Sequence, residues 1–150
     1  MNTASKAPWH LWVLGILGLL WFAGGANDYI QTQTRNEEYL GMMAESVGVP
    51  LETIIGYYTN FPVWADALWA IGVWGAVLGA LLLLLRRRWA FHAFIASIIG
   101  LIGTTIYTYT SDVPAELNSS FSLIFTVVIW VSVIGFAYYA KRMTAAGVLR

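Results

Sequence analysis

The chain has 150 residues, of which 59% are apolar and only 11% charged. Soluble proteins carry roughly 25% charged residues because polar groups must cover their surface, so this composition argues against a soluble globular protein, and its hydrophobicity excludes a disordered one. The formal net charge is zero and cysteine is absent, which argues against a basic nucleic-acid-binding protein and excludes disulfide bonds and thiolate metal sites.

Four segments are long and apolar enough to cross a bilayer, which takes about 20 apolar residues in a helix. They are residues 9–29, 63–85, 89–110 and 121–140. Most of their polar side chains are hydroxyls, which can bond to carbonyl groups of their own helix. We therefore predict an all-α polytopic membrane protein, with residues 1–150 forming a single transmembrane domain built as a four-helix bundle.

The first segment also has features of a secretory signal, because Lys6 precedes an apolar stretch that ends in the small residues 23–26. Its length and its bulky Trp12 and Trp21 are atypical of a signal core. We expect a retained transmembrane helix, with cleavage after residues 1–26 as the alternative.

The loop between the first two spans, residues 30–62, carries two helical patterns. Leu40, Met43 and Val47 recur at helical spacing, Gly48 can end that helix, and Pro50 can begin another. The second helix would have one apolar face, made of Leu51, Ile54, Ile55 and Tyr58. We expect two short amphipathic helices that cap the bundle; a lid and a partner-binding surface are the alternatives.

The charged residues predict the orientation. The N terminus, the turn at residues 86–88 and the C terminus together carry seven of the eight basic residues and no acidic ones, whereas Arg35 and all eight acidic residues fall on the other side. Short loops rich in Lys and Arg remain in the cytoplasm. We therefore expect both termini in the cytoplasm and the loops 30–62 and 111–120 outside.

Small residues recur at helical spacing within the spans, as in Gly75 and Gly79 of the second and Ala96 and Gly100 of the third. Such strips allow helix backbones to approach closely. Packing inside one bundle is the favoured interpretation, and a dimer interface is the alternative.

One polar cluster is the best candidate for a site. Asp66 lies just inside the outer boundary of the second span, and Asn27 and Asp28 lie at a matching depth on the first. Arg35 is the single base among the outer acids, and its planar guanidinium suits pairing with a carboxylate. We predict a cluster of these four residues that pins the loop, with a ligand site as the alternative.

Two histidines near the cytoplasmic boundary, His10 and His92, are interpreted as ordinary interfacial residues. Histidines on facing helices can ligate a haem, which is a minor alternative. No phosphate-binding loop, zinc-protease helix or nucleophile elbow occurs in the sequence. We therefore expect no enzymatic activity, no catalytic residues, and no bound cofactor or metal.

Several segments resemble a family of small bacterial inner-membrane proteins without an established activity, some of which carry the automatic label "sugar transporter". The resemblance covers about residues 19–88 and is carried by Leu19–Trp21, Gly25–Tyr29, Thr32–Leu40 and Trp69–Gly79. It implies a four-helix protein of the inner membrane and brings no activity with it.

The function expected from the sequence is a structural or interaction role within the lipid bilayer, as a homo-oligomer or with another membrane protein, and without nucleic acid. A transporter or channel for a small solute, acting as an oligomer, is the alternative. The apolar run 67–85 offers no polar path for such a solute.

Overall fold

The structure is a computed structural model that describes residues 5–150, so the first four residues of the signal-like segment lie outside it. The described residues form helices and no strand: α1 (Trp9–Gln33), α2 (Glu37–Val47), α3 (Leu51–Thr59), α4 (Val63–Leu84), α5 (Trp89–Thr110), a 3-10 helix η1 (Ala115–Leu117) and α6 (Ser120–Ala145). The four longest, α1, α4, α5 and α6, are each long and apolar enough to span a membrane. The predicted all-α polytopic fold is confirmed.

The spans and the helices agree closely, except where a helix leaves the apolar region. Helix α5 matches the predicted segment, and α4 ends one residue before it, at Leu84. Helix α1 continues to Gln33 and α6 continues to Ala145. Hydropathy marks where apolar residues stop, whereas backbone hydrogen bonding continues through polar residues such as Lys141 and Arg142, which favour helices.

Helices α4 and α5 form the closest pair in the bundle, and small residues are the reason. Any Cβ added to Gly100 of α5 would overlap the backbone of α4, and one added to Gly75 of α4 would lie 3.0 Å from the backbone nitrogen of Ser97. The hydroxyl of Ser97 donates a hydrogen bond to the carbonyl of Gly72 across the same interface. For these glycines, packing inside the bundle is confirmed.

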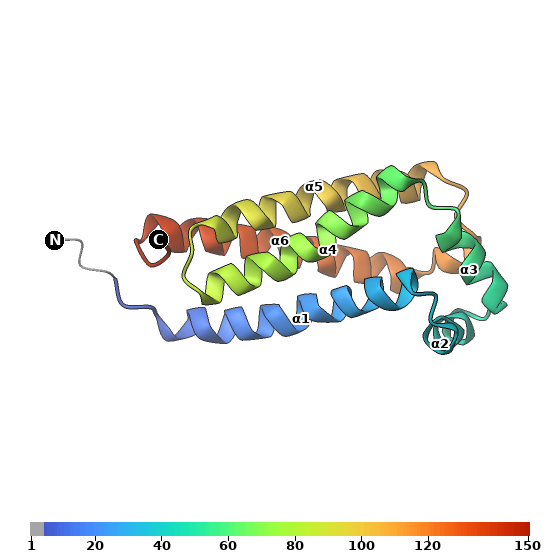
Figure 1. Cartoon of the computed structure of the whole chain (residues 1–150), viewed down its shortest axis with the longest axis horizontal. Helices are drawn as coiled ribbons and strands as arrows, with labels where there is room; N and C mark the ends of the chain where they lie inside the picture. The colour runs from blue at the N-terminus through green and yellow to red at the C-terminus, as the bar shows by residue number, and fades with distance from the viewer. Residues whose placement is uncertain (1–4) are drawn as a thin grey trace.

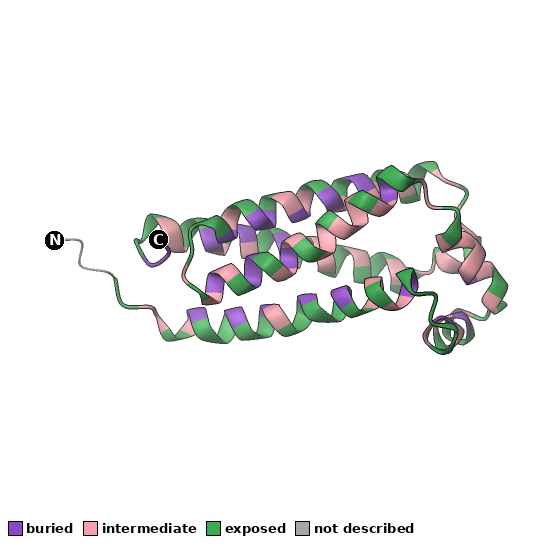
Figure 2. Cartoon of the chain, in the orientation of Figure 1, coloured by how far each residue is buried: buried purple, intermediate pink, exposed green. Residues whose placement is uncertain are grey.

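Three phenylalanines join the remaining helices to this pair. Phe22 of α1 lies 5.3 Å from Phe136 of α6 and 6.0 Å from Phe94 of α5, between ring centroids. Tilted and edge-on contacts of this kind are the favoured geometries of aromatic pairs. Figure 2 shows buried residues on the inward sides of the long helices and exposed residues on their outer sides, where large apolar side chains are typical of a surface that faces lipid.

The two ends of the bundle differ in character (Figure 1). One end, here the basic end, gathers the N-terminal segment, the turn at residues 86–88 and the C terminus. Arg86 donates hydrogen bonds to the carbonyls of Val148 (3.1 Å) and Ser5 (2.7 Å), and backbone bonds join Arg88 and Arg86 to Arg150. The opposite end, here the cap end, consists of α2, α3 and η1.

The two predicted amphipathic helices are confirmed as α2 and α3. The side chain of Asn36 accepts a backbone hydrogen bond at the start of α2, and Gly48 ends that helix in the left-handed conformation, at φ 74°. Pro50 directly precedes α3. Leu40 and Ile54 are buried in a small apolar core shared by the two helices, so the cap folds as one unit.

Candidate functional site

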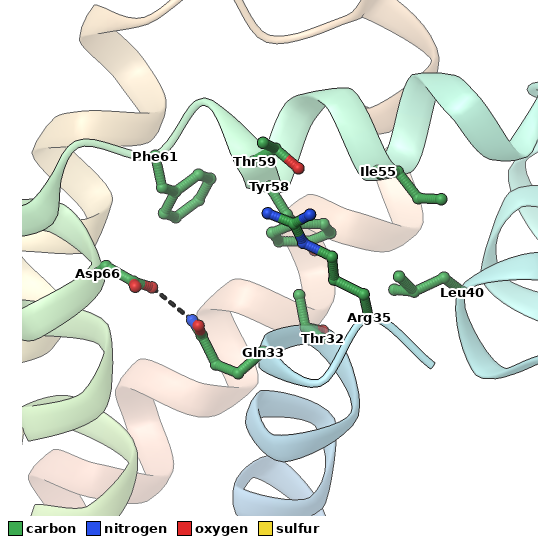
Figure 3. Close-up of a pocket in the computed structure, with 9 residues that line it drawn as sticks. All are labelled: Thr32, Gln33, Arg35, Leu40, Ile55, Tyr58, Thr59, Phe61 and Asp66. Carbon is green, nitrogen blue, oxygen red and sulfur yellow. Dashed lines mark hydrogen bonds between the residues drawn. The ribbon is translucent and has the colours of Figure 1, made fainter. Parts of the chain in front are cut away.

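A cavity of about 150 Å³ lies at the cap end, where the last turn of α1, the end of α3 and the first turn of α4 meet (Figure 3). Nine residues line it: Thr32, Gln33, Arg35, Leu40, Ile55, Tyr58, Thr59, Phe61 and Asp66. Two of the four residues predicted as a cluster, Arg35 and Asp66, are among them. Asn27 and Asp28 are not.

The carboxylate of Asp66 is held by a neutral partner. Gln33 is the last residue of α1, and its side-chain amide donates a hydrogen bond to Asp66 in the first turn of α4 (Figure 3). Asp66 is partly buried, and its carboxylate lies near the N-terminus of α4, which favours negative charge. The bond therefore ties the end of α1 to the start of α4, where the sequence predicted a cluster in which Arg35 would pair with a carboxylate.

Arg35 has an unusual backbone role. It adopts the left-handed conformation at φ 51°, where glycine is the common residue. Its own N–H donates to the carbonyl of Thr32, and the next N–H, of Asn36, donates to Gln31; these two bonds close the end of α1 as a Schellman motif. The side chain is exposed and points toward α3, along one wall of the cavity (Figure 3).

Thr32 is the least exposed polar residue of the cavity, at 4%. Its hydroxyl oxygen is fully buried and has no hydrogen-bond partner in the described part of the chain. Burying a hydroxyl without a partner costs about 1–3 kcal/mol, and this oxygen is closed off from the cavity as well as from solvent. Thr32 was not predicted as a site residue, because nothing in its spacing along the sequence shows that its side chain is buried.

Asp28 belongs to a neighbouring contact outside the cavity. The hydroxyl of Tyr39 in α2 donates to Asp28 at 2.8 Å and thereby fixes the cap to α1. Partial burial, together with this bond and the charge of Asp28, raises the pKa of Tyr39 to about 12. Asn27 is exposed and accepts a long hydrogen bond, 3.4 Å, from Gln31 of the same helix. The structure therefore divides the predicted cluster between two locations.

Aromatic rings form the rest of the wall and hold α3 on the bundle. Tyr58 stacks on Trp69 of α4, with 5.6 Å between ring centroids and 21° between ring planes. The ring centroid of Phe61 lies 4.6 Å from that of Tyr107 in α5. Burial raises the pKa of Tyr58 far above its usual range, and the charge of Asp28 adds to the effect, so its hydroxyl stays protonated. The cavity thus combines rigid aromatic surfaces with polar side chains, among them Arg35 and Asp66.

The two histidines lie in different surroundings. His10 of α1 hydrogen-bonds the hydroxyl of Tyr139 in α6, and its ring packs edge-on against that tyrosine. His92 of α5 lines a second cavity, at the basic end. Within residues 5–150, no group of three or more His, Asp or Glu side chains is arranged to hold a metal ion.

The cap-end cavity can bind a small polar group, since its lining includes a guanidinium and a carboxylate. Comparisons with known proteins add no function to this geometry: no protein-family model, no curated protein and no solved structure matches the chain.

Proposed function

We propose that the chain is a multi-pass protein of the bacterial inner (plasma) membrane with a structural or interaction role, and that it is not an enzyme. The cap end would face outward and the basic end the cytoplasm. The positive-inside rule supports this orientation, because seven of the eight basic residues belong to the segments at the basic end. The resemblance of residues 19–88 to small inner-membrane proteins supports the same location.

The observation that carries the proposal is how the hydroxyl groups inside the spans are used. Five of them could line a polar path, and each donates its hydrogen bond to a backbone carbonyl: Ser97, Thr104, Thr105, Thr126 and Ser132. Ser97 uses its bond to join α5 to α4, and the other four bond within their own helices. A hydroxyl that donates to a backbone carbonyl has no proton left to donate to a passing solute, which supports an interaction role over transport by one chain.

The cap supplies a surface for a partner. Its exposed acidic residues are Glu37, Glu38, Glu45 and Glu52. The Tyr39–Asp28 hydrogen bond and the stacking of Tyr58 on Trp69 hold the cap in one position. A fixed surface loses little conformational entropy when it binds. A membrane protein with a basic outer surface fits this charge, and a second copy of the chain is the alternative partner.

A photo-crosslinking amino acid at Met42, a 59% exposed residue of α2, tests the proposal in intact cells. We expect one discrete adduct that disappears in the Glu38→Lys/Glu45→Lys variant. The matched control, Asp112→Lys/Glu116→Lys, makes the same charge change in the α5–α6 loop and should keep the adduct.

The alternative function predicts a different result. Purified protein in liposomes should leave their permeability to small solutes equal to that of empty liposomes. Solute-dependent swelling of the liposomes, together with no adduct from Met42 in cells, would contradict the interaction role and favour an oligomeric transporter or channel.

A further inference from the structure

The second cavity, of about 290 Å³, lies at the basic end between α5 and α6. Arg88, the N-cap residue of α5, lines it together with Phe91 and His92 of that helix, and Lys141, Thr144 and Ala145 line it from α6. Both sets follow the spacing i, i+3 and i+4, so each set lies on one side of its segment and the two sets form the two walls. Arg88 is the N-cap residue of α5 and the other five residues lie in α5 and α6, so the cavity is formed mainly by the packing of these two helices.

The cavity has positively charged residues at its edge and apolar side chains in its interior. Arg88 and Lys141 carry positive charge, His92 adds a ring nitrogen, and Phe91 and Ala145 supply apolar surface. None of these six described residues carries a carboxylate. A guanidinium binds two phosphate oxygens in one plane and an ammonium binds phosphate as a point charge, so the pair suits a phosphate group.

The position of the cavity indicates where that phosphate comes from. It lies where two membrane-spanning helices end, next to the exposed Trp89, and indole rings favour the headgroup region of a bilayer. Basic pockets between transmembrane helices at this depth suit lipid headgroups. A phospholipid places its phosphate at the edge and its apolar part against Phe91, which a free phosphate ion cannot do.

We propose that this cavity is a binding site for an anionic phospholipid, whose phosphate is held by Arg88 and Lys141 and whose apolar part packs against Phe91 and Ala145. His92 donates an additional hydrogen bond to the headgroup. The site is independent of the cap-end cavity and of the direction in which the protein faces, because both leaflets present headgroups at this depth.

Neighbouring residues provide a matched control for the charge. Arg87 and Arg142 are exposed basic residues in the same turn and the same helix end, and neither lines the cavity. The variants Arg88→Gln/Lys141→Gln and Arg87→Gln/Arg142→Gln remove the same charge from the same end of the bundle. A general attraction to anionic membranes would weaken equally in both.

The test measures lipid binding to the purified protein in detergent, by native mass spectrometry and by thermal stability. The probes are phosphatidylglycerol, phosphatidylcholine and inorganic phosphate. We expect phosphatidylglycerol to bind and to raise the melting temperature, with affinity on the order of tenfold lower in Arg88→Gln/Lys141→Gln and nearly unchanged in the control. Ala145→Phe, which fills the cavity and keeps both charges, should also abolish the effect.

Three outcomes would overturn the proposal. An equal loss of phosphatidylglycerol affinity in the two double variants would show that binding depends only on nonspecific surface charge. Binding of phosphatidylcholine as strong as that of phosphatidylglycerol would show that the anionic headgroup is not recognised. Stabilisation by inorganic phosphate as strong as that by phosphatidylglycerol would make the ligand a free ion.

Discussion

Gly100 of α5 lies so close to the backbone of Gly72 in α4 that no side chain fits at position 100. The hydroxyl of Ser97, one turn before Gly100, bonds to the carbonyl of Gly72, which fixes the register of the two helices. The α4–α5 pair is therefore the rigid centre of the bundle, on which α1 and α6 pack.

Gly100→Ala should lower the stability of the folded bundle by about 1–3 kcal/mol, because the added methyl group meets backbone atoms that cannot rotate away. Thermal unfolding in detergent measures the effect. Gly135→Ala is the matched control, since nothing lies within 4 Å of a Cβ at that position in α6. The control should be neutral or slightly stabilising, because alanine favours helices more than glycine does.

Two arginines with the same backbone geometry should respond differently to glycine. Arg35 and Arg86 both adopt the left-handed conformation after a helix, at φ 51° and 58°. Arg35→Gly relieves that strain and should leave stability equal or raise it by about 1 kcal/mol. Arg86→Gly relieves the same strain but loses two hydrogen bonds, to Val148 and Ser5, and should lower stability by about 1–2 kcal/mol.

Melting temperatures of the two variants give the comparison directly. Arg35→Ala separates the backbone from the side chain, because it keeps the strain and removes the guanidinium. A large loss of stability in Arg35→Gly would favour the ion pair with Asp66 or Asp28 that the sequence suggested. Such a loss would conflict with a backbone role for Arg35.

The contact between Tyr39 and Asp28 predicts a pH dependence. The pKa of Tyr39 is about 12 in the folded protein against an ordinary value of 10.0, so the folded state holds this proton more tightly. The stabilisation is complete below pH 10.0 and is lost as the pH rises toward about 12. In Tyr39→Phe, the loss of stability at alkaline pH that is due to Tyr39 should disappear. The loss of stability that is due to ionisation of Tyr58 should remain.

Ultraviolet titration of phenolate absorbance in the wild-type protein and in Tyr39→Phe isolates this one residue as a difference curve. We expect a midpoint well above that of a free tyrosine. A midpoint near 10.0 would show that the cap does not dock on Asp28 in solution.

The orientation of the bundle can be tested with single cysteines, because the chain has none of its own. Asn118→Cys lies in the exposed α5–α6 loop and Ala146→Cys follows α6 at the basic end. In intact cells, an impermeant thiol reagent should label the first at once and the second only after the membrane is opened. Labelling in the reverse order would place the basic end outside. Ser119 is unsuitable because its side chain caps α6.

The fold could be predicted to within a few residues because its signals are local. Apolar length gave the four spans, Gly48 and Pro50 gave the boundary between α2 and α3, and the spacing of Leu40 with its neighbours gave the buried face of the cap. Each depends on residues within one or two helical turns. The candidate site could be predicted only in part: Arg35 and Asp66 were expected in one cluster and line the same cavity, but Gln33 and Thr32 were missed.

The sequence by itself determined the six α-helices, their boundaries to within a few residues, and the end of the bundle that carries most of the basic residues. Only the tertiary structure decided which sides of the helices meet. A helix such as α4 is apolar all round, so its periodicity does not distinguish the side that faces lipid from the side that faces α5. The rotation of α4 and α5 follows from close packing at Gly72 and Gly100, and the position of α1 beside α4 decides that Gln33 reaches Asp66 while Arg35 turns toward α3.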